Sequence, residues 1–278
     1  MLVDVPLFHL DRPFTYRVPE ALRPDVHLGS RVKVPFGGRR RVDAWVVGQA
    51  AELPPDARDI IRVVSPIPAF GPPELDLLRW VATRYAATVV DTLRLAVPPR
   101  VAAVEASLEA AAEAALEVEA GREPVHTPAV GAVYWRPLPG EDRGARVIGL
   151  VEAALERGRG AIVVTPEVAA GSAVGDAVRK AFPDAADLAS DLSDRRRYRA
   201  WAELRRGRRL VVVGGRSSVL APLPALGCVV VDDEANFAHK ERRTPRFHAR
   251  EVALRRAAVG RALCVLTGTV PSAEALAA

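Results

Sequence analysis

The sequence predicts an α/β protein in two folded parts: a small N-terminal β-barrel-like domain and a larger lobe built on a parallel sheet. At 278 residues the chain is long enough for about two domains. Its first hundred residues contain short β-rich runs separated by proline and glycine. From about residue 129, runs of nearly pure Val, Ile and Leu alternate with amphipathic segments, a pattern typical of a sheet covered by helices.

The first hundred residues are expected to form five short strands and one helix. Turn residues bound each β-rich run, as at Arg12-Pro13 and Gly37-Gly38. The expected strands are Val3–Leu7, Phe14–Val18, Ser30–Phe36, Ala44–Gln49 and Ile60–Val64. Apolar residues then recur at helical spacing over Glu74–Ala86, so one helix should pack on the small sheet.

The second half predicts strands that are buried on both faces. Residues 101–128 begin with an Ala- and Glu-rich helix-forming stretch and are expected to be a solvated helical linker between domains at 1–100 and 129–278. The most apolar strand candidates beyond it are Ala161–Thr165, Leu210–Gly214, Cys228–Asp232 and Ala262–Leu266. Strands this apolar indicate a parallel sheet with helices on both sides.

Composition excludes several classes of protein. No apolar run approaches the roughly 18 residues of a membrane helix, and the N-terminus is not that of a signal peptide, so we expect a cytoplasmic protein without membrane contact. Cys228 and Cys264 lie in apolar runs and are expected to be buried thiols; two thiols cannot build a structural zinc site, and no metal site is expected. The net charge of +5 does not by itself decide between two explanations. It fits a nucleic-acid-binding protein, and it fits equally well an arginine-rich composition without such a function.

Several segments, in order along nearly the whole chain, resemble the primosomal protein N′ (PriA) family. In the first half they are DRPFTYRVPE, LGSRVKVPFGGRRRVDAWVV, DIIRVVSPIPAF and LLRWVATRYAATVVDTLRLAVPP. In the second half they are GAIVVTPEV, LSDRRRYRAW, LVVVGGRSSVLAPLPALGCVVVDDEANFAHK, RFHARE and LTGTVPSAEAL. The resemblance implies a 3′-DNA-end-binding domain followed by one P-loop, RecA-like helicase lobe.

The resemblance implies DNA-contacting residues in the first domain. The family's motif places an aspartate between a phenylalanine and a tyrosine, and that aspartate contacts the terminal nucleotide. Here the tripeptide is Phe14-Thr15-Tyr16, so a hydroxyl replaces the carboxylate that would repel a 3′-phosphate. Arg58 stands where the family places a basic residue, and Gly37 and Gly38 permit close backbone approach.

Two basic runs are further candidates for DNA contact. Arg39, Arg40 and Arg41 follow the glycine turn and could reach phosphates, although a solvated hairpin tip is the alternative. The densest basic run consists of Arg195, Arg196, Arg197, Arg199, Arg205, Arg206, Arg208 and Arg209. Most of it is expected to cover a solvent-facing helix, with some residues touching duplex DNA.

The residues of the motor motifs predict a lobe that does not bind ATP. The family's phosphate-binding loop G-x-x-x-x-G-K-[ST] is represented by the segment with Gly140 and Gly144, in which Ala145 takes the lysine position and Arg146 the hydroxyl position. Glu141 and Asp142 add negative charge where phosphates would lie. The acidic motif is Asp232-Asp233-Glu234-Ala235, and we expect Asp232, Asp233 and Glu234 to be vestigial, with no catalytic residue.

We therefore expect a DNA-binding protein that recognises stalled or abandoned forks with 3′ ends, near the nucleoid, and promotes primosome assembly without helicase or ATPase activity. The expected partners are primosome and helicase-loading proteins and single-stranded-DNA-binding protein. An ATP-dependent 3′–5′ helicase with an atypical site, and a protein-interaction fragment, are the alternatives. We expect no cofactor in this chain. The family's zinc-binding cysteines, winged helix and second lobe have no counterpart in the sequence given.

Overall fold

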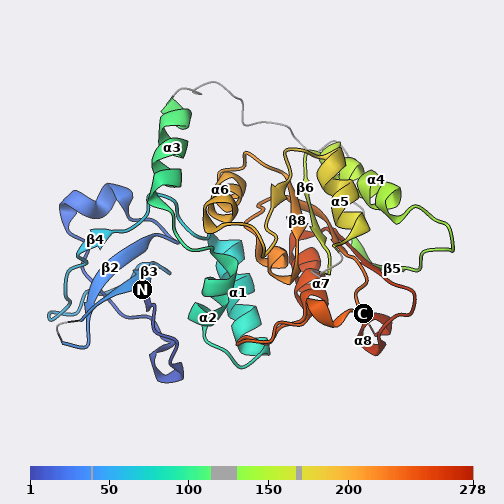
Figure 1. Cartoon of the computed structure of the whole chain (residues 1–278). Coiled ribbons are helices and arrows are strands. Elements are labelled where there is room, and N and C mark those ends of the chain that lie inside the picture. The colour runs from blue at the N-terminus through green and yellow to red at the C-terminus, as the bar shows by residue number, and fades with distance from the viewer. Residues whose placement is uncertain (39, 114–129, 167–170, 278) are drawn as a thin grey trace.

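A computed structural model describes residues 1–38, 40–113, 130–166 and 171–277, with side chains described up to residue 109 in the second range. A small antiparallel sheet and a larger parallel sheet lie on either side of a layer of helices (Figure 1). Within the described ranges, no helix is both long and apolar enough to cross a membrane.

The N-terminal sheet has four strands in the order β1-β3-β2-β4. They are β1 (Leu2–Val3), β2 (Arg31–Phe36), β3 (Arg40–Trp45) and β4 (Arg62–Val63), with short 3₁₀ helices at Phe8–Leu10 (η1) and Glu20–Asp25 (η2). The β2–β3 hairpin turns at Gly37 and Gly38, whose φ angles of 57° and 84° favour glycine. Phe36 pairs with Arg40 directly across this turn.

Four of the five expected N-terminal strands differ from the structure, and the one expected at Ile60–Val64 is reduced to Arg62–Val63. The run expected at Phe14–Val18 forms only a single bridge, between Arg17 and Asp59. The strand expected at Ala44–Gln49 begins earlier, at Arg40, because the tight turn extends the hairpin to its arginines. The strand expected at Val3–Leu7 ends at Val3, since the chain then turns into η1.

Two helices follow where one was expected. Helix α1 (Pro72–Arg84) ends at Arg84 with Tyr85 as its C-cap, and Ala86 has a φ of 48°, which is incompatible with a continuing helix. Thr88 then caps α2 (Val89–Ala96), with its side chain accepting the Asp91 amide, so local capping starts a new helix. Helix α3 (Ala102–Glu113) follows.

The second sheet has six parallel strands in the order β5-β10-β9-β6-β8-β7. They are β5 (Gly131–Trp135), β6 (Gly160–Val164), β7 (Ala186–Asp187), β8 (Val211–Gly214), β9 (Leu226–Val231) and β10 (Leu263–Thr267). The accompanying helices are α4 (Arg143–Leu155), α5 (Ala173–Ala181), α6 (Asp194–Arg205), η3 (Arg216–Leu220), η4 (Phe237–His239), α7 (Ala249–Gly260) and α8 (Ala273–Leu276). The four apolar runs thus form parallel strands, as the sequence predicts.

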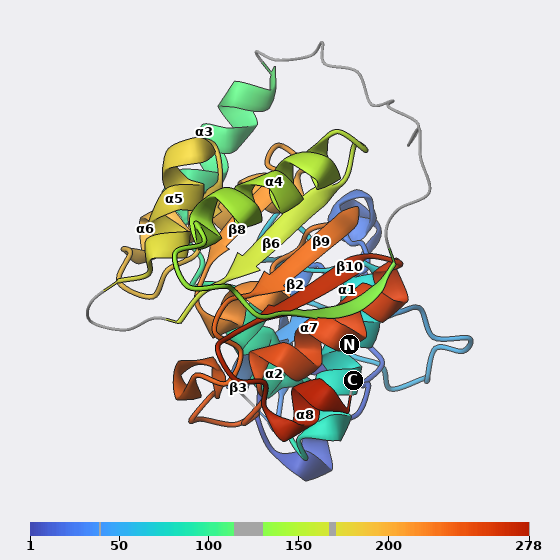
Figure 2. The same ribbon diagram turned by 90° about the vertical axis from the view of Figure 1, so that its right-hand side faces the viewer.

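Both faces of this sheet are buried, as its apolar composition requires. Ala161 and Val163 of β6 pack under α4 and α5, whereas Ile162 and Val164 face the opposite side, with α7 and η3. Figure 2 shows α4 and α5 above the sheet and α7 below it. Cys228 and Cys264 are free and buried, as expected, and burial raises the pKa of the Cys228 thiol to about 12.

Helix α6 joins the two sheets. Its Leu204 belongs to the core of the parallel sheet, and its Trp201 and Tyr198 pack against Phe70 and other buried residues of the N-terminal part. Two sides of one helix therefore contribute to two hydrophobic cores, and the small sheet is held against the lobe.

A buried carboxylate lies at this junction. Glu105 of α3 is 2% exposed; it accepts hydrogen bonds from Ser65 Oγ at 2.6 Å, from Tyr198 Oη and from Arg100 Nε at 2.9 Å. The side chain thus links the N-terminal part, α3 and α6. The beginning of α3 is therefore packed, which differs from the fully solvated linker that the sequence suggested, because α6 supplies an apolar and hydrogen-bonding surface.

Glu105→Ala should lower the free energy of unfolding by about 3 kcal/mol, because two buried partners, Ser65 and Tyr198, lose their acceptor and Arg100 loses its ion pair. Urea denaturation measures this loss. Glu109→Ala, an exposed change on the same helix, is the control and should leave stability within about 0.5 kcal/mol of the parent. Equal effects of the two substitutions would contradict the proposed role of this junction.

His248 should make stability pH-dependent. Its Nδ1 accepts the Arg250 amide at the start of α7, and burial, followed by the charge of Arg250, lowers the pKa of His248 from 6.5 to about 4. Between these values the unfolded chain takes up a proton that the native side chain does not, so stability is lost as pH falls through this window.

His248→Asn keeps a capping acceptor but does not titrate. The destabilisation it causes at pH 7 should therefore shrink by about 2 kcal/mol at pH 5, measured by denaturation at both values. His9→Asn, at an exposed position, should show no such change. A cost of His248→Asn that is the same at both pH values would refute the assignment.

Candidate functional site

The tripeptide Phe14-Thr15-Tyr16 lies against the end of strand β2. The Phe14 ring meets the Phe36 ring edge-on, at 5.3 Å between centroids, and Tyr16 Oη donates to the carbonyl oxygen of Pro35 at 3.1 Å. Both rings are half-buried, whereas Thr15 is exposed. Side chains therefore alternate along this segment between the domain and the solvent. The rings of Phe14 and Tyr16 pack against the domain, and the Thr15 side chain faces solvent.

Arg58 lies beside this segment. The Arg17 amide donates to the Arg58 carbonyl oxygen at 2.9 Å, and the Ile60 amide donates to the Arg17 carbonyl oxygen at 3.0 Å. Burial raises the pKa of Tyr16, and the positive charge of Arg58 opposes part of that rise. The exposed Arg58 side chain is thus close enough to Tyr16 to act on it electrostatically.

The hairpin turn borders the same region. Gly37 directly follows Phe36, and neither Gly37 nor Gly38 has a heavy atom within 4 Å of where a Cβ would lie, so the turn faces open space. Arg40 and Arg41 are exposed and make no ion pair with a carboxylate of the described residues. Arg39 lies outside the described residues.

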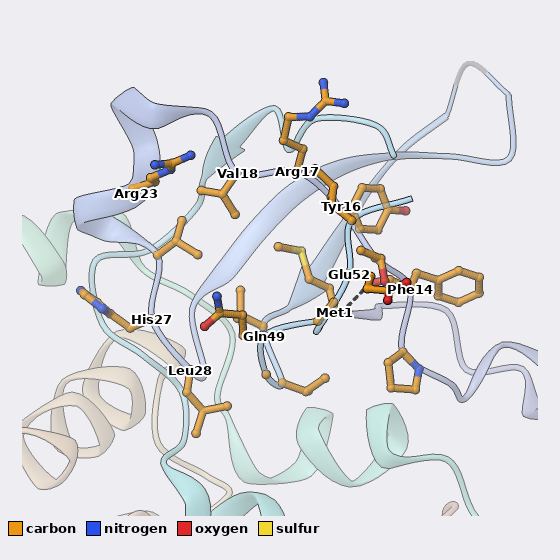
Figure 3. A pocket seen from close by; sticks show the side chains of 18 of the residues that line it. Met1, Phe14, Tyr16, Arg17, Val18, Arg23, His27, Leu28, Gln49 and Glu52 are labelled. Carbon is orange, nitrogen blue, oxygen red and sulfur yellow. Dashed lines mark hydrogen bonds between the residues drawn. The ribbon is translucent and has the colours of Figure 1, made fainter. Parts of the chain in front are cut away.

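A hollow of about 910 Å³ opens on another side of the tripeptide. Figure 3 shows Met1 and Gln49 near its centre, and the rings of Phe14 and Tyr16 to one side. The Met1 ammonium group donates to the Phe14 carbonyl oxygen at 2.7 Å. Gln49 and Glu52 carry no motif signal, so the sequence did not single them out. Arg58 and the hairpin glycines do not line this hollow.

Half of the densest basic run has partners within the protein, namely Arg197, Arg199, Arg205 and Arg209. Arg199 donates to Ser107 Oγ and Arg205 to the Pro68 carbonyl oxygen, each at 2.9 Å, while Arg209 pairs with Glu203 at 2.6 Å. These contacts tie α6 to α3 and to the N-terminal part. Arg195, Arg196 and Arg208 are exposed at the two ends of the helix region. About half of the run therefore stabilises the packing of α6, and its exposed arginines form part of the surface.

A second hollow, of about 460 Å³, lies where the nucleotide of a helicase lobe is expected, between the loop before α4 and the end of β9. Its acidic lining residues are Glu141, Asp142, Asp232 and Asp233, and its basic lining residue is Arg143. Its charge is therefore strongly negative. Within the described ranges, no group of three or more His, Cys, Asp or Glu side chains is arranged to hold a metal ion.

The glycine loop before α4 has structural contacts of its own. The Asp142 side chain caps α4 by accepting the Ala145 amide at 3.0 Å. A Cβ at Gly144 would lie 2.7 Å from the Ala177 Cβ, so this glycine allows α4 and α5 to pack closely. Gly140 takes the left-handed conformation of a turn, with φ 81°. Ala145 and Arg146 are exposed, and neither lines the hollow.

Asp232 already has a cation. It is 4% exposed at the end of β9, forms an ion pair with Arg143, and accepts the Thr267 hydroxyl at 2.9 Å. The Asp233 amide donates to the same hydroxyl oxygen at 3.1 Å, with a φ of 52° that places this residue in the left-handed region. The family motif gives Arg143 no role; the available signal in the sequence was an arginine beside Gly144 in a loop without lysine.

Glu234 faces away from this hollow, into the protein. It is fully buried, pairs with Arg250 at 2.6 Å, and accepts the Ser272 amide at 2.8 Å and hydroxyl at 3.0 Å. Ser272 in turn caps α8. Glu234 therefore connects β9 to α7 and α8.

These side chains do not fit a magnesium nucleotide. The lysine and hydroxyl positions are Ala145 and Arg146, the capping amide of α4 is taken by Asp142, and Asp232 is paired with Arg143. A triphosphate would meet the carboxylates of Glu141 and Asp142 without a lysine to balance its charge.

Comparisons with known proteins agree with the motifs. Residues 1–98 match the family model described as the 3′DNA-binding domain of PriA. The replication restart protein PriA of Treponema pallidum is 31% identical over an alignment 293 residues long. The alignment covers 99% of this chain and 44% of that protein. A Mycobacterium tuberculosis protein named as a probable replication restart protein PriA is 34% identical with the same coverage. PriA of Bacillus subtilis is 33% identical over 128 residues, or 46% of this chain and 16% of its own length.

The chain spans less than half the length of the relatives that match it throughout. The domain match, the identity over nearly the whole chain and the parallel-sheet lobe all agree, and the chain therefore belongs to the primosomal protein N′ (PriA) family.

Proposed function

We propose that this protein binds DNA 3′ ends at stalled or abandoned replication forks and acts in replication restart without hydrolysing ATP. The observation that carries the proposal is the placement of Thr15 between two anchored aromatic residues, beside the exposed Arg58, in a domain that matches a 3′DNA-binding domain.

The geometry suits the end of a strand. Arg58 supplies a cation for the last phosphate, and the Thr15 hydroxyl can donate to, or accept from, a terminal hydroxyl. Because Thr15 carries no charge, a 3′-phosphate meets no carboxylate repulsion at this position, so selectivity for a free 3′-hydroxyl should be lower than with aspartate. Arg40 and Arg41, exposed past the hairpin turn, would add phosphate contacts.

The wider role is part of the same proposal. Branched DNA is the proposed substrate of recognition, with primosome proteins, helicase-loading proteins and single-stranded-DNA-binding protein as partners, in the cytoplasm at the nucleoid. The parallel-sheet lobe would then serve as a scaffold that holds the end-binding domain through α6.

The lobe is proposed to be inactive as a motor. Its loop offers no lysine and no hydroxyl at the two positions that bind phosphate and Mg²⁺, and Asp232 is bound to Arg143. Asp232, Asp233 and Glu234 would then have structural functions only. These contacts weigh against an ATP-dependent helicase as the alternative function.

Arg58→Ala should weaken binding to a fork with a nascent 3′ end at its junction about tenfold, because a phosphate loses its cation. Binding to plain duplex should hardly change. Fluorescence anisotropy at one fixed salt concentration measures both, since such affinities depend steeply on salt.

Arg62→Ala is the matched control, because Arg62 is an exposed arginine four residues away on β4. Both variants remove one positive charge from the same domain. If they weaken fork binding equally, the effect is only one of net charge; if the parent protein binds fork and duplex equally, end recognition is wrong.

The purified chain should release no phosphate from ATP with Mg²⁺, with or without fork DNA, since neither a lysine nor a free Asp232 is present in the cleft. Malachite-green detection of phosphate measures this. The Asp232→Asn variant shows whether any phosphate release comes from the chain itself. A contaminating ATPase would release phosphate equally in both preparations. Release by the parent protein that Asp232→Asn abolishes would contradict the inactive-motor proposal.

A further inference from the structure

We propose that Arg143 is a built-in cation that takes the place of the metal ion in the nucleotide cleft. The guanidinium group, rather than Mg²⁺, neutralises Asp232 and connects the loop before α4 to the acidic motif at the end of β9. This inference rests on the proposal that the lobe does not hydrolyse ATP. It adds the residue that neutralises Asp232 in place of a metal ion.

The first step is the burial of Asp232. Its side chain is 6% exposed, and a charged carboxylate in that position requires a counter-charge. Thr267 Oγ1 donates one hydrogen bond to Oδ1 at 2.9 Å but brings no charge. The ion-pair partner within 4 Å among the described residues is Arg143, through Nη2 on the same oxygen.

The second step is where Arg143 comes from. It is the first residue of α4 and stands two positions before Ala145, which takes the place of the phosphate-binding lysine. In an active site of this type a metal ion is held between the loop's ligands and the acidic residue. Arg143 makes the same connection from loop to acid with one side chain. Its own side chain is 39% exposed, so the guanidinium reaches the carboxylate from the open side of the cleft.

The third step concerns the helix end. Asp142 caps α4 through the Ala145 amide at 3.0 Å, so a carboxylate of the chain sits where a phosphate would be bound at a helix N-terminus. The adjacent residues Asp142 and Arg143 thus satisfy the helix amide and the acidic residue, respectively. The Ala145 amide and the Asp232 carboxylate therefore both have partners within the chain.

The connection extends to a third strand. Thr267, at the end of β10, donates to Asp232 and accepts the Asp233 amide at 3.1 Å. Arg143, Asp232 and Thr267 therefore join α4, β9 and β10 through side chains of the chain itself. The lobe should keep this arrangement in every nucleotide condition, which suits a scaffold.

The test is thermal and chemical unfolding of the full chain, in millimolar MgCl₂ and in NaCl of equal ionic strength, with no nucleotide and no DNA. The parent protein should be equally stable in both salts. Arg143→Ala should lower the folding equilibrium constant about tenfold, a modest loss because the arginine is partly exposed. Mg²⁺ should recover part of that loss, since it binds the folded state through the freed Asp232.

Two further variants make the result specific. Arg146→Ala removes an exposed arginine of the same helix turn and should change neither stability nor the response to Mg²⁺. Arg143→Ala combined with Asp232→Asn removes both charges, so it should be more stable than Arg143→Ala alone and insensitive to Mg²⁺. If Arg143→Ala does not fold, folding of the double variant supports the proposal, and failure of both contradicts it.

Stabilisation of the parent protein by Mg²⁺ to the same extent as Arg143→Ala would overturn the inference, because Asp232 would then be open to metal. So would an Arg143→Ala variant as stable as the parent in both salts. Since neither nucleotide nor DNA is present, these outcomes are independent of whether the protein binds forks or hydrolyses ATP.

Discussion

The fold depends on one constraint: a parallel sheet made of apolar strands must be covered on both faces. Helices α4 and α5 cover one face, and α7, η3 and Leu204 of α6 cover the other. The remaining side of α6, with Trp201, joins the core of the N-terminal part. Covering the sheet therefore also fixes the small domain, and with it the orientation of Phe14-Thr15-Tyr16 relative to the lobe.

Arginine has a consistent second function in this protein as the internal partner of buried acids. Four carboxylates that are at most 7% exposed each pair with an arginine: Glu105 with Arg100, Asp232 with Arg143, Glu234 with Arg250, and Glu241 with Arg216. A buried carboxylate without such a partner would be strongly destabilising. A basic composition therefore overstates the positive charge available to the proposed DNA ligand, because arginines paired with buried acids are already neutralised.

The residues of the acidic motif each make contacts with neighbouring elements of the lobe. Asp232 binds Arg143, Asp233 contacts Thr267 through its amide, and Glu234 holds Arg250 and Ser272. Each carboxylate or amide is used in linking neighbouring elements. Such contacts give a physical reason for retaining these residues in a lobe proposed to have no motor activity.

The sequence by itself determined the parallel strands, the family and the tripeptide, because strand burial follows from apolar runs and family membership from motifs in order. It predicted the bounds of the second hairpin strand and the number of helices after it less accurately. The turn before Arg40 sets where that strand begins, and capping by Thr88 starts a second helix. Only the tertiary structure decided that Arg143 meets Asp232, 89 residues away, and that Glu105 meets Tyr198 across 93 residues. Pairing of distant polar side chains depends on how helices and strands pack, and no local pattern encodes it.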